Sequence, residues 1–151
     1  MGLLLVVVGA LLGIFESVQR SAGFVQERAE TLDTMRLAVD QMTKEIRQAS
    51  VVTPDALDPD SGLEMQTYIL GVERTIEYAV DGENLTRTVD GGTAVVVQKN
   101  LSSPNLFSYT TDPSDIVQVV AVNLQVHPIR RPETIVVLNS EVRLRNRVVV
   151  P

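Results

Sequence analysis

The chain has 151 residues, which suits a single globular domain or one domain with an appendage. With 44% hydrophobic and 21% charged residues it is too apolar for a disordered protein. Its net charge of −6 argues against nucleic-acid partners, which need a basic face, and against electrostatic docking to anionic lipids. With no Cys and a single His, disulfides, thiolate metal sites, cysteine catalysis and His-rich metal sites are excluded.

The chain begins with an uncharged apolar run, residues 2–15, which Glu16 ends. As a helix this run covers roughly 21 Å, against about 30 Å for the hydrocarbon core of a bilayer, so it is too short to span one alone. Three interpretations are open: the apolar region of a secretory signal, a buried core helix, or the distal part of a longer membrane helix. The first lacks a basic n-region and a convincing cleavage site directly after the run.

The next segment, residues 16–50, has the pattern of an amphipathic helix. It contains no Pro, and Gly23 is its only Gly. Apolar residues recur three or four positions apart from Leu32 onward, which is typical of a helix with one buried face. The apolar stripe consists of Val25, Leu32, Met35, Val39, Met42, Ile46 and Ala49. The charged face, which we expect to be opposite and solvated, consists of Glu27, Glu30, Asp33, Arg36, Asp40, Lys44, Glu45 and Arg47.

We therefore predict one continuous helix over residues 1–49, about 75 Å long and longer than one small domain can cover. A break into two helices near Thr31 is the alternative, because Asp33 and Thr34 can cap a helix start. Residues 1–24 are expected to lie in a membrane or a filament core. Residues 25–50 are expected to pack, chiefly through 32–49, on a β-rich domain formed by residues 51–151.

From residue 51 onward the sequence has the short, punctuated pattern of β-strands. Residues 51–62 and 103–115 are rich in turn-forming residues, so we expect loops there. Asp81-Gly82 predicts a tight hairpin turn, because both residues tolerate positive φ. The strand candidates are residues 66–70, 74–80, 84–89, 94–98, 116–126 and 133–146, with an apolar tail at 148–150. The predicted fold is α+β, a mainly antiparallel sheet of five or six strands covered on one face by the helix.

One loop gathers Asp55, Asp58 and Asp60, whose carboxylates are a candidate set of oxygen ligands for Ca²⁺. Their spacing is not that of an EF-hand loop, and a solvated polar loop is the commoner explanation. We predict no other metal site.

His127 stands at a strand end before Pro128 without a catalytic partner in the sequence, and we expect an exposed structural histidine. Basic residues recur near it and in the last strand, at Arg130, Arg131, Arg143, Arg145 and Arg147. Alternating Arg on a strand more often marks a solvent face than an anion site. We expect Arg130-Arg131 to form an exposed basic tip of the hairpin that spans residues 128–132.

No motif carries chemistry. Gly91-Gly92 lacks the spacing and the Lys-Ser/Thr of a phosphate-binding loop, and the chain contains no serine nucleophile elbow. We therefore predict a structural or interaction protein, without cofactor, small-molecule substrate or enzymatic activity.

Six segments carry a resemblance to a known family. They are residues 9–15 (GALLGIF), 19–21 (QRS), 35–49 (MRLAVDQMTKEIRQA), 78–82 (YAVDG), 85–87 (LTR) and 141–146 (EVRLRN). Together they resemble the minor pilins of type IV pili and the J-type minor pseudopilins of type II secretion, most specifically over residues 32–49. The resemblance implies a pilin-like fold, in which the C-terminal half of a long N-terminal helix packs on an antiparallel sheet.

Members of this family are made with a leader that a prepilin peptidase removes before a short start motif, whose Glu helps subunits to join. The chain contains neither feature, and Glu16 lies too far along to stand in for that Glu. Met1 resembles a position near the tenth residue of a mature pilin. We therefore expect the leader and the first mature residues to be missing, which would account for the short apolar run.

The resemblance implies a subunit that helps to initiate or cap a type IV pilus or a type II secretion pseudopilus. Its partners would be other minor and major pilins or pseudopilins. It would be held in the bacterial cytoplasmic membrane by a single pass, with its C-terminal domain outside. The alternative is a membrane-tethered extracellular binding domain, an adhesin or sensor, that is not part of a filament. A secreted hydrolase has little support, because no nucleophile–base pair is visible.

Overall fold

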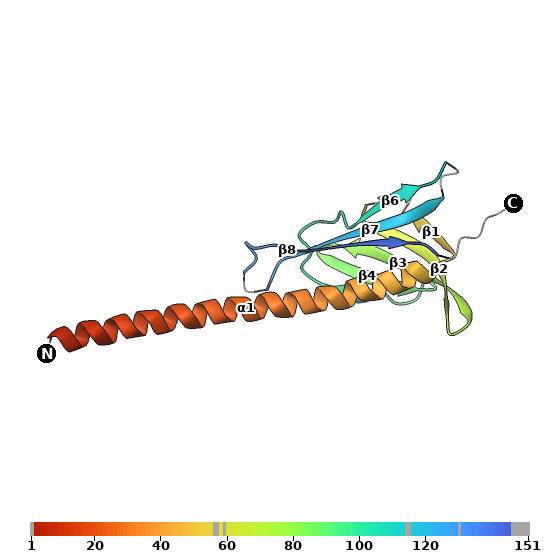
Figure 1. Ribbon diagram of the computed structural model, residues 1–151. Coiled ribbons are helices and arrows are strands. Elements are labelled where there is room, and N and C mark those ends of the chain that lie inside the picture. The colour runs from red at the N-terminus through yellow and green to blue at the C-terminus, as the bar shows by residue number, and fades with distance from the viewer. Residues whose placement is uncertain (1, 56–57, 59, 114–115, 130, 146–151) are drawn as a thin grey trace.

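The computed structural model describes residues 2–55, 58, 60–113, 116–129 and 131–145, with the side chains of its helix described at Phe15 and from Val25 onward. In this part of the chain one long helix, α1, is followed by eight strands (Figure 1). Figure 1 shows the strands gathered over the C-terminal half of α1, while the N-terminal half extends away from them.

The helix α1, Gly2–Gln48, contains 47 residues and runs without interruption through Thr31. The alternative of two helices is therefore wrong. The hydroxyl of Thr31 donates to the carbonyl of Glu27 at 2.9 Å and that of Thr34 donates to the carbonyl of Thr31 at 2.9 Å. Both hydroxyls thus bond back to the preceding turn, as Ser and Thr do inside a helix, instead of capping a new one.

The strands form two antiparallel sheets. The larger sheet has the order β1-β2-β3-β4-β5, and the smaller has the order β6-β7-β8. The larger sheet consists of β1 Val51–Pro54, β2 Gly62–Ile69, β3 Val72–Asp81, β4 Asn84–Val89 and β5 Val95–Gln98. The smaller sheet consists of β6 Phe107–Thr111, β7 Val117–Val126 and β8 Val136–Arg143. The chain is thus α+β, with one helix packed against antiparallel sheets.

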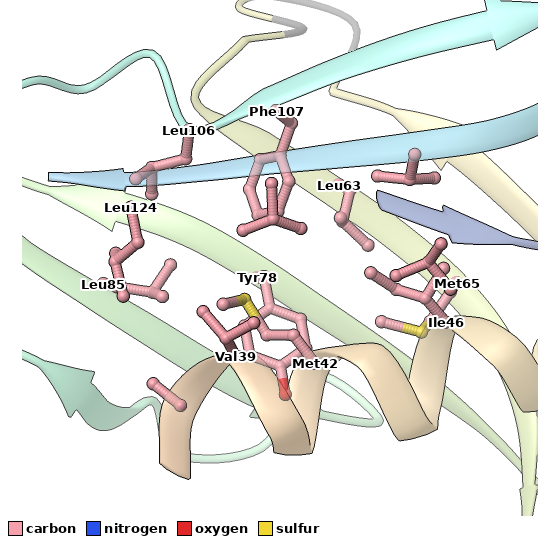
Figure 2. Packing of buried hydrophobic residues seen from close by; sticks show 14 of the residues in the cluster. Val39, Met42, Ile46, Leu63, Met65, Tyr78, Leu85, Leu106, Phe107 and Leu124 are labelled. Atoms are coloured by element: carbon pink, nitrogen blue, oxygen red, sulfur yellow. The ribbon is translucent and has the colours of Figure 1, made fainter. Parts of the chain in front are cut away.

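Both sheets and the helix share one hydrophobic core. The helix packs against β7 and β8 of the smaller sheet and against β2 and β5 of the larger one. Figure 2 shows Met42 and Ile46 of α1 pointing toward the sheets, with Tyr78 and Met65 close to them. Met35, Met42 and Ile46 are completely buried. Because each such side chain contributes about 1.5–3 kcal/mol when it leaves water, this stripe is the main reason why the helix stays on the domain.

Tight turns set the register of two hairpins in the larger sheet. Asp81 is paired with Asn84 across a two-residue loop in which Gly82 has φ +59°, so the hairpin predicted from Asp81-Gly82 is confirmed. The β2–β3 hairpin closes at Leu70-Gly71, where Leu70 has φ +53° and a fully exposed side chain. Positive φ is unusual for leucine, so this turn is strained where Asp81-Gly82 is relaxed.

Three expectations for the β-domain are wrong. Residues 51–62 begin with a strand, since Val51 pairs with Gln66. Pro54 is tolerated there because it ends an edge strand, in which not every N–H is needed for pairing. Residues 103–115 contain β6, which pairs with β7. The strands form two sheets instead of one. All six strand candidates are confirmed, residues 84–89 with the predicted ends and the other five with shifted ends. The tail at 148–150 lies outside the described residues.

Candidate functional site

The N-terminal half of α1 extends beyond the strands, and its described side chains include exposed apolar ones. Phe15 and Val25 have 60% and 66% of their surface exposed. Glu27, Thr31 and Leu32 are half-buried, and burial becomes complete at Met35. The spacing of the apolar residues predicted that Val25 belongs to the stripe that faces the sheets, and this prediction is wrong. In the described residues no helical segment is both long and apolar enough to cross a membrane.

A polar cluster joins this helix to the larger sheet. The carboxylate of Glu45 accepts hydrogen bonds from the Tyr78 hydroxyl at 2.7 Å and from the Arg87 guanidinium, Nε at 3.1 Å and Nη2 at 2.7 Å. Tyr78 and Arg87 are cross-strand partners on β3 and β4, so both side chains leave the same face of the sheet. The two-pronged Arg–carboxylate pair fixes distance and orientation together, which locks the helix to the sheet in one register.

The cluster lies where water has little access. The side chains of Arg87 and Glu45 retain 18% and 16% of their exposure, and Tyr78 is completely buried. The hydrogen bonds to Glu45 raise the pKa of the Arg87 guanidinium above its ordinary value. Burial, followed by the charge of Glu45, raises the pKa of the Tyr78 hydroxyl far above its ordinary value. The Arg87 guanidinium and the Tyr78 hydroxyl are thus both held in their protonated forms, which donate the hydrogen bonds of the cluster.

The sequence-based prediction placed Glu45 on the solvated face of the helix, and this is wrong. Glu45 borders the apolar stripe, and the sheet that reaches over this border supplies its two partners. The sequence of β4 contained a pattern that could have predicted this buried ion pair. Arg87 lies between Leu85 and Val89 in the series of alternate β4 residues that face the core. A charged residue in such a series needs an oppositely charged partner from another element.

Tyr78 makes the stability of the protein sensitive to alkaline pH. Its pKa is raised in the folded state, so above about pH 10 the unfolded chain loses this proton while the folded protein keeps it. Stability is therefore fully present below that pH and falls as the pH rises. We expect Tyr78→Phe to reduce this alkaline loss by about 1.4 kcal/mol in total between about pH 9 and 11, as measured by urea unfolding. Tyr68→Phe, which alters a ring that is 56% exposed, is the matched control and should leave the slope as it is.

The acidic loop serves as a brace and does not form a ligand set. The carbonyl of Asp60 accepts hydrogen bonds from the main-chain N–H groups of Leu106 at 2.7 Å and Phe107 at 2.9 Å, which attaches the loop to the start of β6. Asp58 N–H donates to Oδ1 of Asp55 at 3.5 Å. In the described part of the chain no three Asp, Glu or His side chains come together in a group suited to a metal ion. Within these described residues, Asp55, Asp58 and Asp60 are thus not brought together as such a group.

His127 follows the last residue of β7 and is half-buried, not exposed as we expected. Its Nδ1 lies 3.0 Å from the carbonyl oxygen of Thr134 and, facing an acceptor, donates to it. The main-chain N–H of His127 donates to the carbonyl of Asn100 at 2.8 Å. The first contact closes the β7–β8 connection on itself, and the second attaches this connection to the segment that follows β5.

The predicted basic tip is only partly tested. Arg131 is half-buried, so an exposed tip is wrong for this residue, and Arg130 lies outside the described residues. Arg143 and Arg145 are exposed, as expected for a solvent face, and Arg147 lies outside the described part of the chain.

Comparison of the chain with protein-family models, with curated proteins and with solved structures gives no match.

Proposed function

We propose that the protein is a structural subunit of the minor pilin or minor pseudopilin kind, which helps to initiate or cap a type IV pilus or a type II secretion pseudopilus. The projecting part of α1 enters the cytoplasmic membrane or the filament core. The β-domain stays outside and meets neighbouring pilins or pseudopilins. The packing of one long helix against antiparallel sheets and the resemblance of residues 32–49 support this proposal.

The main support for the proposal is that only the C-terminal part of α1 is buried against the β-domain. α1 extends from Gly2 to Gln48, yet its complete burial against the β-domain starts only at Met35. An apolar run such as residues 2–15 gains little from projecting into water, because burying apolar surface is the dominant favourable term in folding and assembly. A lipid bilayer or the helices of neighbouring subunits would bury it.

Photo-crosslinking from the helix tests the proposal. The chain has no Cys, so Phe15→Cys creates a single attachment point for a maleimide–benzophenone reagent. In the native host we expect this variant to crosslink to another pilin-type subunit in a sheared filament fraction. Glu64→Cys, on the exposed face of β2, is the matched control for labelling away from the helix.

A different result would contradict the assembly role. If Phe15→Cys crosslinks only to lipid and the protein stays with the membrane after shearing, the chain is a membrane-tethered extracellular binding domain. If the label reaches neither lipid nor protein, the projecting helix does not have the surroundings that we propose.

A further inference from the structure

The hairpin between β2 and β3 ends in exposed apolar side chains. Leu70, at its apex, is 100% exposed, more than any other large hydrophobic side chain in the described part of the protein. Tyr68 and Val72 beside it have 56% and 52% of their surface exposed. We call these three residues the apolar tip. Apolar side chains that gather at one exposed point are typical of an interaction site.

The geometry of the turn does not explain why a leucine stands at its apex. Leu70 and Gly71 have φ +53° and +80°. The same combination of positive φ angles recurs at Asp90 and Gly91, with φ +51° and +66°. Asp-Gly is a favoured sequence for such a turn, whereas a leucine is strained in this conformation. Because the side chain of Leu70 is strained and wholly exposed, a contact outside its own chain accounts for it better than the fold does.

An apolar recess of about 250 Å³ lies between α1 and the β7–β8 connection. Its apolar wall consists of Pro128, Ile135 and Val136. Pro128 and Val136 are buried, but Ile135 has 51% of its surface exposed. The recess therefore offers an apolar wall that an entering side chain can cover.

The apolar tip and the recess lie at opposite ends of the β-domain. The recess adjoins Arg28 of α1. The main-chain N–H of Ser50 donates to the carbonyl of Gln66 at 2.9 Å, so the hairpin lies past Gln48, where α1 ends. From Arg28 to Gln48 the helix rises roughly 30 Å. Figure 1 shows the β7–β8 connection beside the middle of α1 and the β2–β3 hairpin beyond its C-terminal end, so the two can meet only between molecules.

The tip and the recess carry opposite charges. Beside the tip, Glu73 is exposed and is the cross-strand partner of Tyr68, while the neighbouring Arg74 is already paired with Asp90. The surroundings of the tip are therefore negative by one charge. The charged residues that line the recess are two arginines and one glutamate, which leaves one positive charge, and they are Arg28, Arg131 and Glu27.

We propose that the apolar tip of one copy of this chain binds in the recess of a second copy. Leu70 covers Ile135, which removes apolar surface of both from water, and Glu73 lies toward Arg28. Since the two surfaces are at opposite ends, the contact is head-to-tail and can repeat from copy to copy. A lipid chain would also cover Leu70 but would leave Glu73 without a cation. The inference does not depend on the pilin proposal, because both surfaces belong to the β-domain and the part of α1 beside it.

Disulfide crosslinking of the full-length protein in detergent tests this inference. The chain has no Cys, so the double variant Leu70→Cys/Ile135→Cys carries one thiol in the tip and one in the recess. Under mild oxidation we expect a ladder of linked dimers, trimers and longer chains on non-reducing gels, whereas either single variant can give only dimers. The matched control is Thr93→Cys/Ile135→Cys, which should give no ladder. Thr93 is exposed and follows β4, at the same end of the larger sheet as the tip.

A charge exchange separates this contact from association through the apolar part of the helix. In the double-cysteine protein, Glu73→Arg or Arg28→Glu alone brings like charges together and should lower the yield of the ladder by about fivefold. The two changes together restore opposite charges and should recover the yield. Both side chains are exposed, so thermal unfolding of these variants should match that of the parent protein.

Leu70→Asn distinguishes a contact residue from a structural one. Asn tolerates positive φ better than Leu, so this change should raise the midpoint of thermal unfolding. At the same time it should lower self-association, as measured by sedimentation velocity, because the apolar tip is lost. A leucine that served the fold alone would give a lower midpoint and unchanged association.

Several results would overturn the inference. The paired variant could give no ladder, or Thr93→Cys/Ile135→Cys could give an equal one. A charge exchange that does not restore the yield would show that association does not use the tip and the recess. Dimers of Leu70→Cys alone that are as abundant as those of the pair would show a symmetric contact. None of these results changes what crosslinking from Phe15 reports, so the proposed function is tested separately.

Discussion

Glu45→Ala should lower the free energy of unfolding by about 2–4 kcal/mol, because it leaves the guanidinium of Arg87 and the hydroxyl of Tyr78 in a nearly dry site without an acceptor. Urea unfolding at neutral pH measures this loss. Glu45→Gln keeps one acceptor oxygen but removes the charge, so an intermediate loss is expected. Replacing both Glu45 and Arg87 by Leu should cost less than Glu45→Ala alone, because no charge is then left buried.

The matched control is the exposed pair on the same helix. Arg36 and Asp33 lie 3.4 Å apart, with 64% and 71% of their side chains exposed. Exposed pairs contribute about 0.2–1 kcal/mol, so Asp33→Ala should change stability little. If Glu45→Ala and Asp33→Ala cost the same, Glu45 does not lock the helix to the sheet.

Ile46→Ala should be about as damaging, with an expected loss of about 2–5 kcal/mol. Ile46 is completely buried between α1 and the sheets, so truncation removes apolar contacts and leaves a cavity in a close-packed core. Equilibrium unfolding in urea measures the loss, and the slope of the transition should stay the same if only the folded state has changed.

Leu37→Ala is the control for helix propensity and side-chain size. Leu37 is on the same helix and has 72% of its surface exposed, so we expect a change of less than about 0.5 kcal/mol. Equal losses in Leu37→Ala and Ile46→Ala would mean that the helix is held by something other than its buried stripe.

The buried stripe and the Glu45 cluster contribute differently to the attachment of α1. The buried stripe supplies most of the free energy, through contacts that have little directional preference. The pair between Glu45 and Arg87 is directional and fixes the register. If the projecting half of α1 is embedded in a filament or a membrane as we propose, the pair between Glu45 and Arg87 also fixes the orientation of the β-domain relative to the embedded helix.

Local patterns were enough to predict several features. The helix and its stripe from Leu32 to Ala49 follow from a 3.6-residue period, and the Asp81-Gly82 hairpin follows from turn chemistry. The α+β class follows from the change of period after residue 50. Each of these depends on residues within a few positions of one another, so the chain encodes them without reference to the rest of the fold.

Only the tertiary structure decided the features that join distant segments. The division of the strands into two sheets depends on pairing between segments whose alternation is similar, so the sequence did not distinguish it from a single sheet. The burial of Glu45 required β3 and β4 to reach over the border of the helix stripe. The exposure of Val25 depends on where the domain stops along α1. A residue's helical or strand position is a local property, but its neighbours across the fold are not.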